Sequence, residues 1–295
     1  MSPPLCQVAM SVTDLPRTHR WYREVFGYRS AFGTNAFHGF LAERVQGVAG
    51  AASSCWWLCD GQPFFQLELF AFYRPEVRAL PPDWSPRDIG YSTLLLYVAN
   101  FDEVLERLEK QGGAASGPVQ GNAGERRVCV RDPEGVLLEL FERDPLQDQR
   151  ELDDPGTPVV TLGVALSVPD LAQALNSFRE LLELEDAGFD LHDASHEALW
   201  GLEGARSERH LLRAGQSLVE LVQYREPAPR AQPDDYRISD QGLLNIALGY
   251  RHRADFRRAH RRALDGGMHP NWRPLDLGAW KVVYVNDPAN FSVEM

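Results

Sequence analysis

The pattern of apolar and polar residues predicts a module with one helix and several strands at the start of the chain. Gln7–Val12 alternates at period two, which is typical of a strand. Asp14 stands where a helix would begin, because its carboxylate can accept hydrogen bonds from free first-turn N–H groups. Apolar residues spaced by three and four continue the helix to Gly27, a residue that suits a helix end. Three strand-like stretches follow, so the module is predicted as β-α-β-β-β.

The same module is predicted at the start of the second half. Asp170 takes the place of Asp14 and precedes a helix with one apolar face. The residues of that face are Leu171, Ala174, Leu175, Phe178, Leu181 and Leu182. The three strands expected after this helix are Glu197–Trp200, His210–Arg213 and Leu218–Tyr224.

A second module completes each half. In the first half, its predicted strand, helix and two further strands are Thr93–Val98, Phe101–Gln111, Val128–Val130 and Val136–Phe141. In the second half, the corresponding elements are Asn245–Tyr250, Ala254–Leu264, Lys281–Val285 and Phe291–Met295. Turns that begin at Asp132 and at Asp287 separate the last two strands of each module. The chain is therefore predicted to hold four modules.

Direct sequence similarity supports a duplication of the two-module unit. Eight of 22 positions are identical between residues 7–28 and residues 163–184, at an offset of 156. The Asp-Pro turns near the end of each half match at an offset of 155. We therefore expect a first domain over residues 1–145, an acidic linker over residues 146–157 and a second domain over residues 158–295.

Composition and charge narrow the range of partners. Of 295 residues, 44% are hydrophobic and 24% are charged, which fits a folded globular protein rather than a disordered chain. Lys and Arg number 30 against 42 Asp and Glu, and the net charge of −12 argues against binding to nucleic acid or to an anionic membrane surface. The four cysteines form no disulfide framework, and no signal segment or long apolar run is present. We therefore expect a cytosolic, reduced protein.

Four sequence strings, in order along nearly the whole chain, carry a family resemblance. They are Val8–Leu15 with Trp21-Tyr22-Arg23, Asp132–Leu140, Val164–Leu171 with Phe178-Arg179, and Asp287-Pro288 through Glu294. These strings resemble the vicinal oxygen chelate superfamily, which includes glyoxalase I, extradiol dioxygenases and bleomycin resistance proteins. The resemblance implies an α+β fold, in which four βαβββ modules pair into two cupped mixed sheets with a ligand site inside each.

The resemblance also implies which residues would hold a metal, because family enzymes use the first and last strands of their modules. The corresponding positions in the first half are Gln7, Glu68, Thr93 and Glu139. Those in the second half are Gly163, Glu220, Asn245 and Glu294. Gln66 lies two residues before Glu68, on the same face of the predicted strand, and could take its place.

These residues depart from the metal sites of the family. Extradiol dioxygenases need two histidines and one glutamate, whereas the first-strand positions of the second half carry Gly163 and Asn245, which argues against iron-dependent dioxygenation there. In the first half, Gln7 and the two glutamates resemble part of a glyoxalase I site, with Thr93 in place of the imidazole. We expect no firmly bound cofactor, and at most a weakly held divalent metal such as Mg, Mn, Zn or Fe.

Two carboxylates in one cup favour proton transfer. Since two ionised carboxylates repel each other, either Glu68 or Glu139 should have a raised pKa. Such a pair suits acid–base chemistry next to a carbonyl group. We therefore expect an isomerase or lyase for a small organic molecule, with Glu139 and Glu68 as catalytic residues. The residues expected to contact the substrate are Gln7, Thr93, Gln66 and Tyr91.

Two other functions stay open. The acidic charge and the aromatic residues would also suit a metal-free protein that binds a cationic or aromatic molecule, as bleomycin resistance proteins do. The other alternative is a metal-dependent glyoxalase or dioxygenase with unusual ligands. In each case we expect a monomer or a homodimer with a small-molecule partner.

Some basic residues outside these positions are expected at the surface. His192 and His196 lie in a loop-like context, and the Arg-rich run over residues 251–262 is typical of a solvated helix face. The same run could instead meet an acidic partner or a phosphate-bearing substrate.

Overall fold

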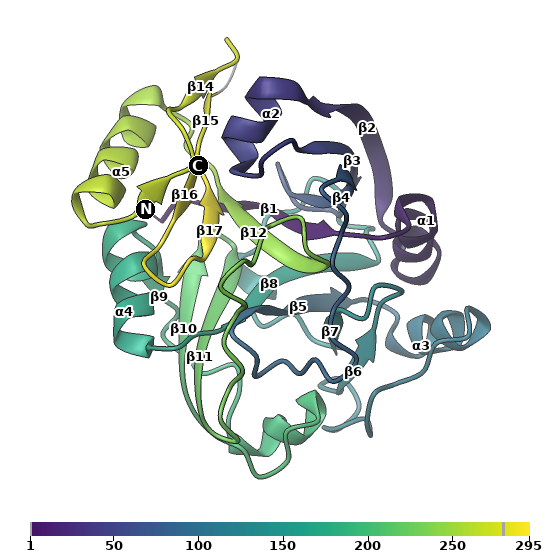
Figure 1. Cartoon of the computed structure of the whole chain (residues 1–295). Helices are drawn as coiled ribbons and strands as arrows, with labels where there is room; N and C mark the ends of the chain where they lie inside the picture. The colour runs from purple at the N-terminus through teal and green to yellow at the C-terminus, as the bar shows by residue number, and fades with distance from the viewer. Residues whose placement is uncertain (1, 279–280) are drawn as a thin grey trace.

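The computed structural model describes residues 2–278 and 281–295, whose strands form two large mixed sheets (Figure 1). One sheet has eight strands in the order β13-β16-β17-β12-β1-β4-β3-β2, and the other has seven in the order β6-β7-β5-β8-β11-β10-β9. Strands β14 and β15 form a small third sheet. The predicted α+β fold of four modules in two large sheets is confirmed.

The first half contains two modules and the start of a linker. The first module comprises β1 (Leu5–Ser11), α1 (Leu15–Phe26), β2 (Arg29–His38), α2 (Gly39–Gln46), β3 (Ala52–Cys59) and β4 (Gln66–Arg74). The second comprises β5 (Gly90–Val98), α3 (Phe101–Lys110), β6 (Arg127–Arg131) and β7 (Leu137–Phe141). A short 3-10 helix, η1 (Gln147–Gln149), lies in the linker.

The second half repeats this order with added short elements. The third module comprises β8 (Val159–Ser167), α4 (Leu171–Leu175), the π-helical η2 (Asn176–Leu181), β9 (Glu185–Asp186), the 3-10 helix η3 (Ala194–Trp200), β10 (Arg206–Ala214) and β11 (Ser217–Glu226). The fourth comprises β12 (Gly242–Leu248), α5 (Arg253–Asp265), β13 (His269–Pro270), β14 (Leu275–Asp276), β15 (Lys281–Val282), β16 (Tyr284–Asn286) and β17 (Ser292–Glu294).

The local signals for the helices were accurate, whereas one strand was wrong. Asp14 accepts a hydrogen bond from the Arg17 N–H, and Gly27 ends α1 in the left-handed conformation. Asp170 caps α4 in the same way as Asp14 caps α1. The strand predicted at 197–200 is instead the end of η3, which Asp193 caps by accepting a hydrogen bond from a backbone N–H.

The modules pair in an order that crosses the two halves. Strand β1 lies antiparallel to β12, which joins the first module to the fourth, and β5 lies antiparallel to β8, which joins the second to the third. The prediction that each half builds its own cup was therefore wrong. All four modules begin with a similar strand. The sequence repeat alone therefore does not determine whether the first module pairs with the second or with the fourth. The domain boundaries that we inferred from the sequence repeat, at residues 145 and 158, stay a prediction.

Each large sheet has an apolar inner face on the side away from the main core. The first cup is the inner face of the eight-stranded sheet, and its buried apolar residues are Ala9, Cys55, Trp57, Phe70, Phe72 and Leu244. The second cup belongs to the seven-stranded sheet, and its apolar residues include Cys129, Leu137, Ala165, Trp200, Val222 and Tyr224. The opposite faces of both sheets pack with α1, α3, α4 and α5 into one shared core.

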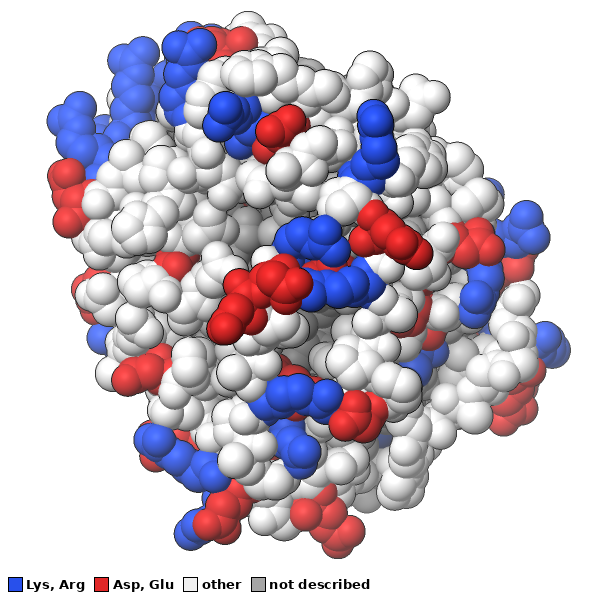
Figure 2. All heavy atoms as spheres, viewed as in Figure 1, with Lys and Arg blue, Asp and Glu red and all other residues white. Residues whose placement is uncertain are grey.

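The surface and the cysteines agree with the predictions from composition. Figure 2 shows acidic and basic side chains interspersed over the visible face, with basic ones gathered over α5, where the Arg-rich run was predicted to form a solvated helix face. The four cysteines, Cys6, Cys55, Cys59 and Cys129, are all free thiols. No helix among the described residues combines the length and apolar character that crossing a bilayer would require.

Two connecting segments hold each other by reciprocal ion pairs. We call residues 75–89 the first strap and residues 227–241 the second strap. Arg78 of the first strap contacts Asp240 of the second (Nη2–Oδ2 2.5 Å), and Arg230 contacts Asp88 (Nη2–Oδ2 3.2 Å). The two pairs are related by an offset of 152 residues. A second aspartate contacts each arginine as well: Asp235 and Asp83.

The straps pack against the cups. Val77, next to Arg78, and Ile238, close to Asp240, pack against the apolar residues of the first cup. Trp84 of the first strap packs against those of the second cup. The Arg78–Asp240 pair therefore fastens the straps next to the first cup, and the Arg230 pairs lie toward the second.

Breaking one strap contact should open one cup. In Arg78→Gln, we expect a thiol reagent to modify the buried Cys55 of the first cup about fivefold faster, because an ion pair of this kind contributes about 1 kcal/mol. Peptide mapping after timed labelling measures the rates of Cys55 and Cys129 separately. Arg230→Gln is the matched control, and it should accelerate the modification of Cys129 more than that of Cys55. Equal acceleration at both cysteines in Arg78→Gln would indicate general destabilisation and contradict the prediction.

Candidate functional site

The first cup gathers polar side chains from four strands. Gln7 comes from β1, Glu68 from β4, Asn245 from β12 and Glu294 from β17. Ala9 lies between Asn245 and Glu68 in the register of the three central strands, so its small side chain leaves space between them. These strands therefore bring two carboxyls and two amides together on a floor of small residues.

One oxygen of Glu68 is held firmly and the other is free. Oε1 accepts hydrogen bonds from Nε2 of Gln7 at 3.0 Å and from the indole N–H of Trp57. The same Gln7 nitrogen donates to Oε1 of Gln66, also at 3.0 Å. Oε2 of Glu68 is buried and has no hydrogen-bond partner within residues 2–278 and 281–295. A fixed carboxylate with one unsatisfied oxygen is suited to act on a ligand.

Burial raises the pKa of both Glu68 and Glu294, and the charge of Glu294 adds to the rise at Glu68. Burial, followed by the nearby charge of Glu294, raises the pKa of Glu68 to about 8, and the hydrogen bond from Trp57 opposes this rise. Burial raises the pKa of Glu294 to about 7, and its hydrogen bond with Tyr284 opposes the rise. Near neutral pH the two carboxyls therefore share protons.

Asn245 adds a second unsatisfied group to this floor. Its side chain is almost fully buried, and neither Nδ2 nor Oδ1 finds a hydrogen-bond partner in the described part of the chain. A buried amide without partners costs free energy, so a ligand that bonds to it would be bound more tightly. The first cup thus offers an amide and a carboxylate oxygen to one bound molecule.

The donors of the first cup fit a hard divalent cation better than a soft one. Two carboxylates and two amide oxygens are ligands that Mg²⁺ or Mn²⁺ accepts, and the buried free atoms of Glu68 and Asn245 are available for this purpose. Zn²⁺ and Fe²⁺ favour sites with histidine or cysteine. The described residues contain no cluster of three or more His, Cys, Asp or Glu suited to a metal.

The second cup is filled by a network of its own side chains. Glu139 is fully buried and accepts hydrogen bonds from Nε of Arg127 (2.8 Å) and from the indole nitrogen of Trp200 (2.6 Å). His192 lies between two carboxylates, with Nε2 2.8 Å from Oε2 of Glu139 and Nδ1 2.7 Å from Oε2 of Glu220. The imidazole therefore occupies the space between the two glutamates.

Opposite charges keep Glu139 ionised and His192 protonated in this network. Burial raises the pKa of Glu139, but the charges of His192 and Arg127 outweigh this effect and lower the pKa to about 2. Burial lowers the pKa of His192, but the two adjoining glutamates outweigh it and raise the pKa. Arg209 completes the network through ion pairs with Glu197 and Glu220. A carboxylate paired in this way is a poor base.

Two first-strand positions of the second cup offer little to a metal. Gly163 cannot be replaced by a ligand residue, because a Cβ there would lie 1.8 Å from the carbonyl oxygen of Leu218 and its φ is +153°. Thr93 is buried, and its hydroxyl has no hydrogen-bond partner among the residues described. The space between the glutamates of the second cup is therefore taken by the ion-paired side chain of His192.

The structure regroups the residues that the sequence assigned to one site. Gln7 and Glu68 lie in the first cup, whereas Thr93 and Glu139 lie in the second, so the predicted grouping of Gln7, Glu68, Thr93 and Glu139 was wrong. The grouping of Gly163, Glu220, Asn245 and Glu294 was wrong for the same reason. In both cases β1 pairs with β12, and β5 with β8, across the two halves.

Three further expectations are corrected or refined. Gln66 lies beside Glu68 and bonds to Gln7, as a residue on the same strand face should. Tyr91 packs in the shared core, where its hydroxyl donates to the carbonyl of Ser292, so it does not join Gln7 and Gln66 in the first cup. His192 is buried, not at the surface, because two glutamates compensate for its burial.

Several site residues were not found from the sequence. They are Arg127, Trp200, Arg209 and Tyr284. No sequence pattern marks Trp200 as a partner of Glu139, because η3 carries it into the cup from a separate segment.

Known proteins share this architecture. A sequence model of the Glyoxalase/Bleomycin resistance protein/Dioxygenase superfamily matches residues 5–140. Glyoxalase I from Zea mays superimposes with a TM-score of 0.66 at 16% identity, over 99% of this chain and 92% of that chain. A putative dioxygenase from Bacillus subtilis subsp. subtilis str. 168 gives 0.66 at 14% identity, over 99% and 84%. No curated protein sequence matches. These structural similarities extend the shared fold over nearly the whole chain.

The carboxyl pair should make stability depend on pH. In the unfolded chain both carboxyls ionise near 4.5, whereas in the folded protein Glu68 and Glu294 keep their protons to about 8 and about 7. The folded state then binds more protons, so the free energy of unfolding should fall as pH rises through this window. Urea unfolding at about pH 5 and about pH 9 measures the effect. Glu68→Gln should gain stability relative to the unmodified protein at the higher pH, and a pH-independent difference would contradict the prediction.

The second cup should depend on its buried histidine. His192→Gln leaves two buried glutamates without a compensating cation and should cost about 3–5 kcal/mol of unfolding free energy. His210→Gln is the control, since it removes a histidine–aspartate pair at the surface and should cost less than about 1 kcal/mol. Denaturant titration of both variants gives the comparison. Similar losses in the two variants would show that the His192 network is not a stabilising centre.

Proposed function

We propose that the first cup catalyses proton transfer on a small organic molecule. The premise is the match of residues 5–140 to the Glyoxalase/Bleomycin resistance protein/Dioxygenase superfamily, which places the chain in that superfamily. The reaction is of the isomerase or lyase type. The observation that carries the proposal is the pair of carboxyls, Glu68 and Glu294, beside the unsatisfied amide of Asn245. The four free cysteines support a reducing, cytosolic setting.

The base in this mechanism is Glu68. Its Oε1 is held by Gln7 and Trp57, so the free Oε2 keeps a fixed position from which it can take a proton from a carbon next to a carbonyl. The two carboxyls exchange the shared proton, and the reactive form is the one in which Glu68 is ionised and Glu294 carries the proton, which it gives to the substrate oxygen as negative charge develops there. Return of a proton from Glu68 to the neighbouring carbon, while Glu294 takes back the proton of the hydroxyl that becomes the new carbonyl, completes an isomerisation and restores both carboxyls.

Asn245 stabilises the developing oxyanion. Its Nδ2 is a buried donor without a partner among the described residues, and hydrogen bonds in such surroundings are strong. The apolar wall of Trp57, Phe70 and Phe72 excludes water and keeps the carboxyl pKa values near neutral pH. General acid–base catalysis is most effective when the pKa of the catalytic group is close to the working pH.

The same residues would hold a divalent cation if one is part of the holoenzyme. Glu68, Glu294 and the amide oxygens of Gln7 and Asn245 supply its ligands, and the cation would polarise the substrate carbonyl. Glu139, which was expected to be catalytic, has no role in this proposal, because it belongs to the ion pairs of the second cup.

A second candidate function is binding without turnover. The aromatic wall and the acidic floor of the first cup suit a planar cation, which would stack on Trp57 and Phe70 and lie near Glu68. Replacing Glu68 by glutamine would leave the stacking on Trp57 and Phe70 in place, so such a ligand would still bind. The enzyme hypothesis predicts a large loss of rate for the same change.

The proposal predicts catalysed exchange of carbon-bound hydrogen. A panel of 2-hydroxy and 2-oxo aldehydes and acids in D₂O should include compounds whose α-proton signal disappears faster with the protein, as followed by ¹H NMR. Glu68→Gln should slow this exchange by about 100-fold or more, because proton transfer by a positioned group contributes at least that much.

The control for this experiment is Thr93→Val, which changes the second cup alone and should exchange at the rate of the unmodified protein. Compounds that bind, as judged by thermal stabilisation, without any exchange would contradict the enzyme and favour the binder. Exchange that persists in Glu68→Gln would contradict the assigned base.

A further inference from the structure

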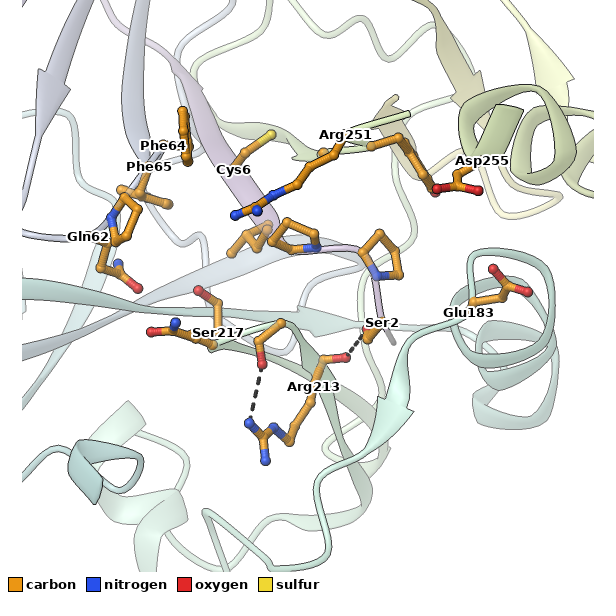
Figure 3. Close-up of a pocket in the computed structure, with 18 of the residues that line it drawn as sticks. Ser2, Cys6, Gln62, Phe64, Phe65, Glu183, Arg213, Ser217, Arg251 and Asp255 are labelled. Atoms are coloured by element: carbon orange, nitrogen blue, oxygen red, sulfur yellow. Dashed lines mark hydrogen bonds between the residues drawn. The ribbon is translucent and has the colours of Figure 1, made fainter. Parts of the chain in front are cut away.

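A large groove lies outside both cups, next to the first strand. It has a volume of about 1340 Å³ and is bounded by residues 2–6, the turn between β3 and β4, the turn between β10 and β11, and the start of α5 (Figure 3). None of Gln7, Glu68, Asn245 and Glu294 lines it. The groove exceeds the range of about 300–1,000 Å³ that is typical of small-molecule pockets, so an extended ligand would fit.

Two arginines of the groove form no ion pair with a carboxylate of the described residues. Arg251, in the Arg-rich run before α5, makes no hydrogen bond or ion pair among residues 2–278 and 281–295, and its guanidinium points across the groove toward the turn that carries Phe64 and Phe65 (Figure 3). Arg213 donates only to neutral oxygens, those of Gln149 (2.7 Å) and Gly215 (3.3 Å).

Most acidic side chains of the groove are already engaged. Asp255 pairs with Arg258, Glu183 pairs with Arg262 at 2.7 Å, and Glu185 accepts from the backbone N–H of Ser2 at 3.1 Å. Glu151 is exposed at the edge of the groove. Arg251 therefore presents a positive charge that is not held in an ion pair with any of these carboxylates, on a chain whose overall charge is −12.

An exposed aromatic residue stands at the edge of the same groove. Phe64 is 82% exposed, and its backbone has φ +60°, a conformation that bulky residues rarely adopt. Such a conformation costs free energy and often accompanies a functional position. The apolar part of the lining continues beside it with Pro3, Pro4, Leu5 and Phe65.

We infer that this groove binds an organic anion with an aromatic or apolar part. Arg251 and Arg213 attract the anionic group, because neither guanidinium is held in an ion pair and guanidinium groups pair well with carboxylates and sulfonates. Phe64 and the proline segment cover the apolar part. Tyr250 also lines the groove, and its hydroxyl is buried without a hydrogen-bond partner in the described structure. This site is independent of the proton transfer proposed for the first cup.

A fluorescent aromatic sulfonate, 8-anilinonaphthalene-1-sulfonate, is the probe for this site. We expect saturable binding to the full chain, and about tenfold weaker binding in Arg251→Gln, since the variant loses a charge-assisted contact. Phe64→Ala should weaken binding about fivefold. Both residues are exposed, so neither change should affect folding.

The matched control is Arg253→Gln, two residues along the same run, whose side chain contacts Gly278 and Asp276 instead of the groove. It should bind the probe like the unmodified protein. Absence of saturable binding, or equal affinities in Arg251→Gln and Arg253→Gln, would overturn the inference. Benzenesulfonate should displace the probe at lower concentrations than inorganic phosphate; equal displacement would overturn the role given to the apolar wall.

Discussion

The pairing of β1 with β12 and of β5 with β8 is the constraint on which the rest of this structure depends. These two antiparallel contacts join the first module to the fourth and the second to the third. They decide which glutamates share a cup: Glu68 meets Glu294, and Glu139 meets Glu220. Had the modules paired within each half, Glu68 and Glu139 would face each other. The order of the strands in each sheet therefore determines which ionisable side chains meet in each cup, and so determines their chemistry.

The same residue type has opposite properties in the two cups. In the second cup, His192 and arginines neutralise the buried glutamates, and the pKa of Glu139 falls to about 2. In the first cup no cation approaches Glu68 among the contacts described, so burial and repulsion raise its pKa to about 8. The first cup thus holds two buried carboxyls with raised pKa values, whereas ion pairs fill the second. Reciprocal ion pairs between the straps connect these two different environments.

Much of this architecture was predictable from local patterns. Asp14 and Asp170 mark helix starts by a short-range rule, and period-two spacing places Gln66 and Glu68 on one strand face. The partner of β1 was not predictable, because a repeat makes two module pairings look alike. His192 and Trp200 were missed for a related reason, since they reach Glu139 through a loop and a 3-10 helix that follow no periodic pattern. Long-range contacts of this kind depend on tertiary packing.

The most direct test of the central claim is to measure the ionisation of the first-cup carboxyls by ¹³C NMR of glutamate side chains. The account predicts that Glu68 and Glu294 titrate between about pH 7 and about pH 8. It also predicts that Glu294→Gln lowers the pKa of Glu68, because the repelling charge is gone, whereas Glu139→Gln leaves it unchanged. Titration of both carboxyls near 4.5, or a Glu68 pKa that responds to Glu139 and not to Glu294, would contradict the account.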